Sequence, residues 1–123
     1  MATFKKFEEI QAWQKAREVT QKIYLISNNE KFVKDFSLRD QMKRASVSIM
    51  ANIAEGHARF HTKEFLNHLS IARGSLAELE TELMISQRVG FLKEDVLAKV
   101  LVMADEIGRM TAGLRQGLEA KLS

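Results

Sequence analysis

Apolar residues recur every three or four positions over four long stretches of this chain, which is the spacing of one face of an α-helix. In the third stretch the apolar positions alternate steps of four and three, as in a heptad repeat. They are Phe65, Leu69, Ala72, Leu76, Leu79 and Leu83. The fourth stretch repeats this spacing with Val96, Val100, Met103, Ile107, Met110 and Leu114. No segment alternates apolar and polar residues long enough to predict a strand.

The first two stretches are less regular, but they also favour helices. The first carries Phe7, Ile10, Trp13, Ala16, Thr20, Ile23 and Ile26, and the second carries Leu38, Met42, Ala45, Ile49, Asn52 and Gly56. We therefore predict one domain over residues 1–123, with helices over about 7–26, 38–56, 63–89 and 94–120. Because short connections make sequential helices antiparallel neighbours, the predicted fold is all-α, an up-down-up-down four-helix bundle.

Local signals predict where these helices begin and end. Ser37, with Asp40 three residues later, is the expected N-cap of the second helix, and Thr62 is that of the third. Gly90 is expected to end the third helix as its C′ residue.

Composition narrows the class of protein. The chain has 123 residues, enough for one core, and contains no proline or cysteine. It therefore has no disulfide framework and no thiolate nucleophile. The N-terminus lacks the apolar region of a secretory signal, and no apolar run approaches the roughly 20 residues of a membrane span. We expect a cytoplasmic protein.

Polar residues interrupt the apolar face of the second helix. Asn52 occupies a heptad core position, and beside it runs a row of polar residues at helical spacing: Gln41, Arg44, Ser48, Asn52, Glu55 and Arg59. The third helix offers a complementary row of His68, Ser75, Glu78 and Glu82. Two interpretations stay open. The row fixes register and oligomeric state, as a buried amide does in coiled coils, or it contacts a ligand or nucleic acid.

The residue pattern gives little support for a metal site or a catalytic site. His57, His61, Glu64 and His68 have ligand-like spacing, but Gly56 and the Thr62 cap predict a bend that would break their common face. No two helices carry the Glu-x-x-His motif of di-iron bundles. We therefore expect no enzyme activity, no cofactor and no metal site.

Two longer motifs resemble a known family. "QMKRASVSIMANIAEGHAR", residues 41–59, and "LSIARGSLAELETEL", residues 69–83, are similar to the four-helix bundle protein family, also called S23 or 23S rRNA intervening-sequence proteins. The opening "FEEIQAWQKA", residues 7–16, fits as well. The resemblance implies a bacterial protein that assembles into a homo-oligomeric ring, a pentamer. The family is also related to accessory proteins of diversity-generating retroelements, which are basic pentamers that bind nucleic acid.

The resemblance also carries over individual residues. Those that match the two motifs are Arg44, Ser48, Asn52, Glu55, Gly56, Arg59, Gly74, Ser75, Glu78 and Glu80. It implies binding of structured RNA or DNA, and the alternative is a protein-interaction scaffold without a nucleic-acid role.

Charge suggests where a nucleic acid would bind. The net charge is +3, and residues 1–61 hold 11 basic and 7 acidic side chains, a surplus of four positive charges. The expected phosphate contacts follow from this asymmetry together with the resemblance. They are Lys5, Lys6, Lys15, Lys43, Arg44 and Arg59.

Overall fold

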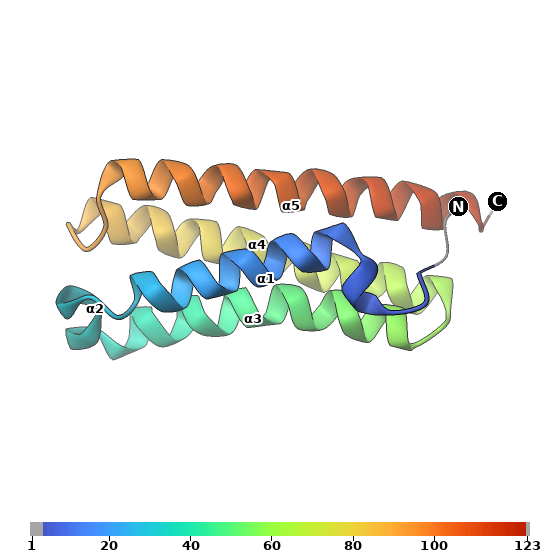
Figure 1. Ribbon diagram of the computed structural model, residues 1–123, viewed down its shortest axis with the longest axis horizontal. Helices are drawn as coiled ribbons and strands as arrows, with labels where there is room; N and C mark the ends of the chain where they lie inside the picture. Colours follow the sequence, from blue (N-terminus) through green and yellow to red (C-terminus); the bar gives the residue numbers. More distant parts are fainter. Residues whose placement is uncertain (1–3, 123) are drawn as a thin grey trace.

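The computed structural model describes residues 4–122, and within this range every regular element is a helix. A short 3₁₀ helix, η1 (Phe7–Glu9), is followed by α1 (Gln11–Ile26), α2 (Glu30–Lys34), α3 (Phe36–Ala58), α4 (Thr62–Arg88) and α5 (Glu94–Ala120). Figure 1 shows the long helices side by side, with the chain turning back at each connection. The predicted all-α helical bundle is confirmed.

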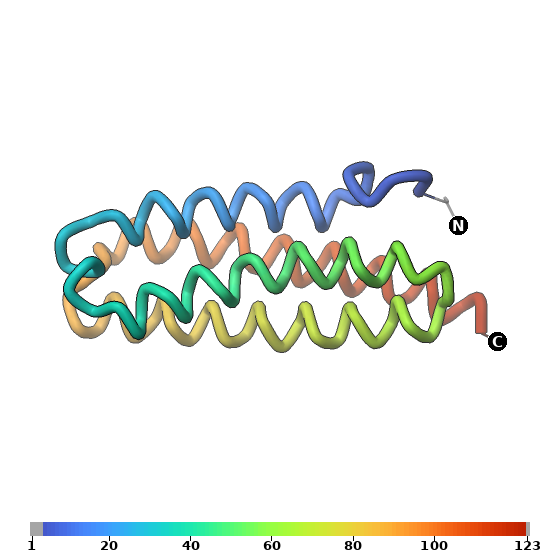
Figure 2. The backbone as a smooth tube through the Cα atoms, turned by 90° about the horizontal axis from the view of Figure 1, so that it is seen from below, coloured from blue at the N-terminus to red at the C-terminus, as the bar shows by residue number. Residues whose placement is uncertain are grey.

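The helices enclose one apolar core. Helix α3 packs against α1 and α4, and α5 closes the bundle by packing against α4 and α1. The heptad positions of α4 are buried, and Leu69, Leu79 and Leu83 have no exposed surface. The first and last residues that the structure describes lie at the same end of the bundle as the α3–α4 turn (Figure 2).

The first helix begins later than the apolar pattern predicted. Ile10 adopts an extended backbone (φ −76°, ψ 119°) and separates η1 from α1, so the helix starts at Gln11 and not at Phe7. Ile10 is 2% exposed, and its burial in the core holds this break in place. Phe7 still belongs to the apolar face, because its ring meets Trp13 edge to face at 5.1 Å.

The connection between α1 and α3 contains a helix that the sequence pattern did not predict. The side chain of Asn29 caps α2 by accepting from the backbone N–H groups of Lys31 and Phe32. Phe32 is fully buried, and this anchors the segment. Helix α3 is capped by Asp35, which accepts from Leu38 N at 3.0 Å. The prediction of Ser37 as this cap was wrong, because α3 begins at Phe36 and Ser37 already lies inside it.

Helix α3 also continues past the predicted end at Gly56 and finishes at Ala58. Gly56 is buried where α3 crosses α4, and a Cβ there would lie 2.7 Å from Phe65 Cδ1 and 2.9 Å from His68 Cβ. It therefore permits a close approach of two helices and does not bend the chain. The turn itself is made by Phe60, whose φ is +60°.

The sequence predicted the C-terminal glycine of α4 correctly but not the residue that caps its N-terminus. Thr62 is the first residue of α4, and the preceding His61 occupies the cap position without a side-chain hydrogen bond. The Thr62 cap was therefore wrong. At the other end Gly90 has φ +83°, as expected of a C′ residue. The N–H of Phe91 donates to Ser86 O at 2.8 Å and that of Gly90 to Gln87 O at 3.1 Å, the two bonds of a Schellman motif.

Candidate nucleic-acid interface

The polar rows of α3 and α4 meet as one hydrogen-bonded network within the chain. Ser48 Oγ and Ser75 Oγ lie 2.8 Å apart, and the Asn52 amide donates to Ser48 O at 2.9 Å. His68 Nδ1 lies 3.0 Å from Asn52 Oδ1 and 3.7 Å from a carboxylate oxygen of Glu55. These bonds join the two helices across their seam, so each polar side chain that they involve has a partner.

Nearer the other end of the seam, the carboxyl group of Glu82 is poorly satisfied. Glu82 is 6% exposed, and its Oε1 has no hydrogen-bond partner among the described residues. Burial first, and then a hydrogen bond and repulsion from the neighbouring Glu78, raise the pKa of Glu82 to about 7. The charge of Arg44 acts in the opposite direction.

Glu80 and Gly74 are among the motif residues that lie away from this network. Glu80 faces α5, where burial first and the charge of Asp105 second raise its pKa. Gly74 is exposed on α4, and none of the described residues has an atom within 4 Å of a Cβ built there. The two family motifs are therefore divided between the α3–α4 seam, the α4–α5 groove and the outer surface.

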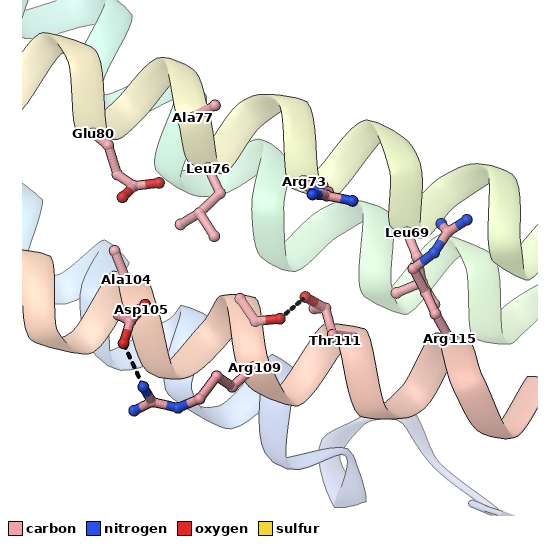
Figure 3. Close-up of a pocket in the computed structure, with 12 residues that line it drawn as sticks. Leu69, Arg73, Leu76, Ala77, Glu80, Ala104, Asp105, Arg109, Thr111 and Arg115 are labelled. Atoms are coloured by element: carbon pink, nitrogen blue, oxygen red, sulfur yellow. Dashed lines mark hydrogen bonds and ion pairs between the residues drawn. The ribbon is translucent and has the colours of Figure 1, made fainter.

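The groove between α4 and α5 has a volume of about 390 Å³. Figure 3 shows Arg73 and Glu80 facing Asp105, Arg109 and Thr111 across an apolar floor. Arg109 pairs with Asp105, and Thr111 Oγ1 donates to Ile107 O at 2.9 Å.

Another part of the surface, the end of the bundle at the α3–α4 turn, combines positive charge with an exposed aromatic ring. His57 Nε2 lies 2.7 Å from Phe4 O, which ties the N-terminal segment to the end of α3. The exposed residues gathered there are Lys5, Lys6, Arg59, Phe60 and Lys63, and we call them the basic tip. Phe60 is 86% exposed, the largest value among the exposed large apolar residues described. Two acidic residues lie beside the basic tip. The carboxylate of Glu9 accepts from Lys5 N, and Glu64 lies in the first turn of α4.

The six predicted phosphate contacts do not form one surface. Lys5, Lys6 and Arg59 lie at the basic tip. The ammonium of Lys15 is 3.1 Å from both Glu18 and Glu106, so it is already neutralised. Lys43 and Arg44 lie in the N-terminal half of α3, away from the basic tip. The ammonium of Lys43 is 4.9 Å from the centre of the Tyr24 ring.

Sequence reasoning missed Phe60 and Lys63. Phe60 lies outside the apolar pattern of every predicted helix and stands among polar residues in "ARFHTK". This was the one sign in the sequence that could have drawn attention to it. A bulky residue with positive φ is also uncommon, and such conformations tend to occur where function requires them.

No group of three metal-binding side chains occurs in the part of the chain that the structure covers. Two of the three histidines of the ligand-like pattern have other partners, since His57 contacts Phe4 O and His68 contacts Asn52. Of the helices described, none is long and apolar enough to cross a membrane.

Comparisons with known proteins agree with the motifs. The model of a family described as 23S rRNA-intervening sequence protein matches residues 8–113. A crystal structure from Bacteroides thetaiotaomicron, of a protein with unknown function from the S23 ribosomal protein family, superimposes with a TM-score of 0.77. The two sequences are 25% identical, and the match covers 85% of this chain and 97% of the other. No curated protein shows significant sequence similarity to the chain.

Proposed function

Because the chain belongs to the 23S rRNA-intervening sequence protein family, we propose that it is a non-enzymatic protein that binds structured RNA through the basic tip. The observation that carries this proposal is the 86% exposed ring of Phe60 beside Arg59 and Lys63. Proteins recognise RNA most readily at loops and bulges, where unpaired bases stack on aromatic side chains and basic groups contact the phosphates.

The helical bundle gives the basic tip a rigid support. Phe60 and Arg59 lie in a turn of three residues between α3 and α4, two helices that pack along their whole length. A ring held on such a support loses little conformational freedom when a base stacks on it. We further propose that up-down-up-down bundles of this kind assemble into a homopentamer. A ring of copies would present several tips to one RNA and raise its overall affinity.

The stacking role of Phe60 predicts a specific loss. Phe60→Ala is expected to weaken binding of a structured RNA with an unpaired loop about tenfold, because stacking on an aromatic side chain contributes about 1–3 kcal/mol per base. Fluorescence anisotropy with the labelled RNA measures this. Phe36→Ala is the matched control, since Phe36 is a 62% exposed aromatic residue at the start of α3, at the opposite end of the bundle. Equal losses in the two variants would contradict the proposal.

The charge of the basic tip predicts a salt dependence. With about three phosphate contacts to single-stranded RNA, affinity should fall roughly 20-fold between 50 and 200 mM salt. Replacing Lys5, Lys6 and Arg59 by glutamine should remove most of this slope. Lys15→Gln should leave the slope unchanged, because its ammonium is neutralised by Glu18 and Glu106. Duplex DNA serves as the competitor that tests whether RNA is preferred.

The alternative is a protein-interaction scaffold. If assembled protein binds neither RNA nor DNA even at low salt, the nucleic-acid proposal is overturned and the scaffold becomes the better account.

A further inference from the structure

The groove between α4 and α5 has the size and the lining of a site for a small ligand. Its volume of about 390 Å³ falls within the range of roughly 300–1,000 Å³ that is usual for ligand pockets. Its floor is made of leucines and of small residues that keep it open: Leu69, Leu76, Ala77, Ala104, Gly108 and Ala112. An apolar floor of this kind holds the body of a ligand, and the few polar groups around it determine which ligand fits.

One end of the groove is basic. The Arg115 guanidinium reaches from α5 to α4, where Nη1 donates to Ser70 Oγ at 2.8 Å and to Leu66 O at 3.1 Å. Its Nε lies 3.6 Å from Glu119. Arg73 lies one helical turn after Ser70 and, within the described part of the chain, forms no ion pair shorter than 4.0 Å. Its guanidinium is therefore available to a carboxylate, which arginine can bind through two parallel hydrogen bonds.

The opposite end of the groove is acidic. Glu80 points from α4 into the groove on the side where Asp105 lies (Figure 3). Burial first, and the charge of Asp105 second, raise the pKa of Glu80, so the two carboxyl groups repel each other. Arg109 pairs with Asp105, whereas Glu80 has no ion-pair partner within 4.0 Å among the residues described. A cation placed here would pair with Glu80 and offset this repulsion.

The spacing of the two unpaired charges indicates the class of ligand. Arg73 and Glu80 are seven residues apart on α4, which is about 10 Å along the helix axis. A purely anionic ligand would be repelled by Glu80, and a purely cationic one by Arg73. A ligand with an ammonium group at one end and a carboxylate at the other satisfies both. Because each residue of an extended peptide spans about 3.3–3.6 Å, the free termini of a tripeptide lie about 10 Å apart.

We propose that the α4–α5 groove binds a short zwitterionic peptide of about three residues, with its ammonium group at Glu80 and its carboxylate at Arg73. The apolar floor receives the side chains of the peptide and so favours apolar ones. The groove shares no residue with the basic tip. The inference therefore goes beyond the proposed function and does not depend on RNA binding.

Isothermal titration calorimetry with the tripeptide Leu-Ala-Leu tests the inference. The free peptide should bind to the wild-type protein. N-acetylation removes the ammonium group and C-amidation removes the carboxylate, and each should weaken binding about tenfold, because each removes a charge-assisted hydrogen bond. No binding of the free peptide at millimolar concentration overturns the inference. Equal affinities of the free and the capped peptides also overturn it, because the groove would then recognise neither terminus.

Variants of the protein test whether each terminus meets the residue assigned to it. Glu80→Gln should weaken binding of the free peptide about tenfold and leave binding of the N-acetylated peptide unchanged, because the two groups act as a pair. Arg73→Gln should likewise affect the free peptide and not the C-amidated one. Arg88→Gln is the matched control, since Arg88 ends α4 outside the groove and its loss should change nothing.

Ala112→Trp provides a test that does not depend on charge. Ala112 is an exposed residue of the groove, so a tryptophan there should fill the space without disturbing the core. Binding of the free peptide should be lost, while the helical content measured by circular dichroism stays that of the wild type. If this folded variant binds the peptide as the wild type does, the peptide lies elsewhere and the groove is not its site. Glu80→Gln weakening the free and the N-acetylated peptide equally would contradict the assigned orientation.

Discussion

Replacing Gly56 with alanine is expected to lower the free energy of unfolding by about 2 kcal/mol, although alanine is the better helix former. The added Cβ would lie 2.7 Å from Phe65 Cδ1, 2.9 Å from His68 Cβ and 3.3 Å from Phe65 Cα. The last two atoms belong to the backbone of α4 or are attached directly to it, so rotation of one side chain cannot relieve the overlap. Helices α3 and α4 must separate, and core contacts along the seam are lost.

The control for Gly56 is Gly108, another glycine inside a long helix. Among residues 4–122, a Cβ on Gly108 would meet only Leu76 Cδ2, at the ordinary contact distance of 3.9 Å. Gly108→Ala should therefore raise stability by up to about 1 kcal/mol, through helix propensity alone. Urea denaturation of the two variants at one protein concentration measures the difference. If Gly56→Ala were as stabilising as Gly108→Ala, the close crossing of α3 and α4 would be refuted.

Glu82→Gln is expected to raise stability at pH 8 by about 2 kcal/mol and to remove part of the pH dependence of unfolding. Burial, together with the neighbouring Glu78, raises the pKa of Glu82 from 4.5 to about 7 in the folded protein. The folded state therefore holds a proton that the unfolded state releases between these values. As the pH rises from about 4.5 to about 7, this carboxyl group lowers the free energy of unfolding, and above that range the loss is complete.

The measurement is urea denaturation at pH 5 and pH 8 for the wild type and for Glu82→Gln. The wild type should lose about 2 kcal/mol more than the variant between these two pH values. Glu78→Gln is a useful companion, because Glu78 contributes to the raised pKa and Arg44 opposes it. Removing Glu78 should reduce the difference without abolishing it. Parallel pH profiles for the wild type and Glu82→Gln would show that Glu82 stays charged throughout.

The long helices were predictable because their apolar periodicity extends over many turns. Leu69, Leu79 and Leu83 were assigned to the core from spacing alone and are fully buried. The short helix α2 was missed, because five residues contain too little of the helical period to be recognised. The cap of α3 was misplaced for a related reason. Asp35 and Ser37 are both good caps by residue type, and only the path of the chain decides between them.

The candidate site was less predictable than the fold. Helical spacing placed Ser48 and Asn52 opposite Ser75 and His68, because neighbouring antiparallel helices bring such rows together. Spacing could not show that Glu80 points to a different helix, or that Lys15 is neutralised by Glu106 of α5. Both depend on how the helices are rotated against one another. Sequence pattern does not determine that rotation, because packing of the whole core does.

The three-residue turn between α3 and α4 has a consequence for the order in which the molecule folds. Contacts between these two helices close short loops and need little chain entropy to form. The contacts between α1 and α5 join segments from the two halves of the chain, and they form only when most of the sequence is already compact. The α3–α4 hairpin is therefore suited to serve as the folding nucleus. In that order of events, the turn that carries Phe60 takes shape early, before the bundle closes around its core.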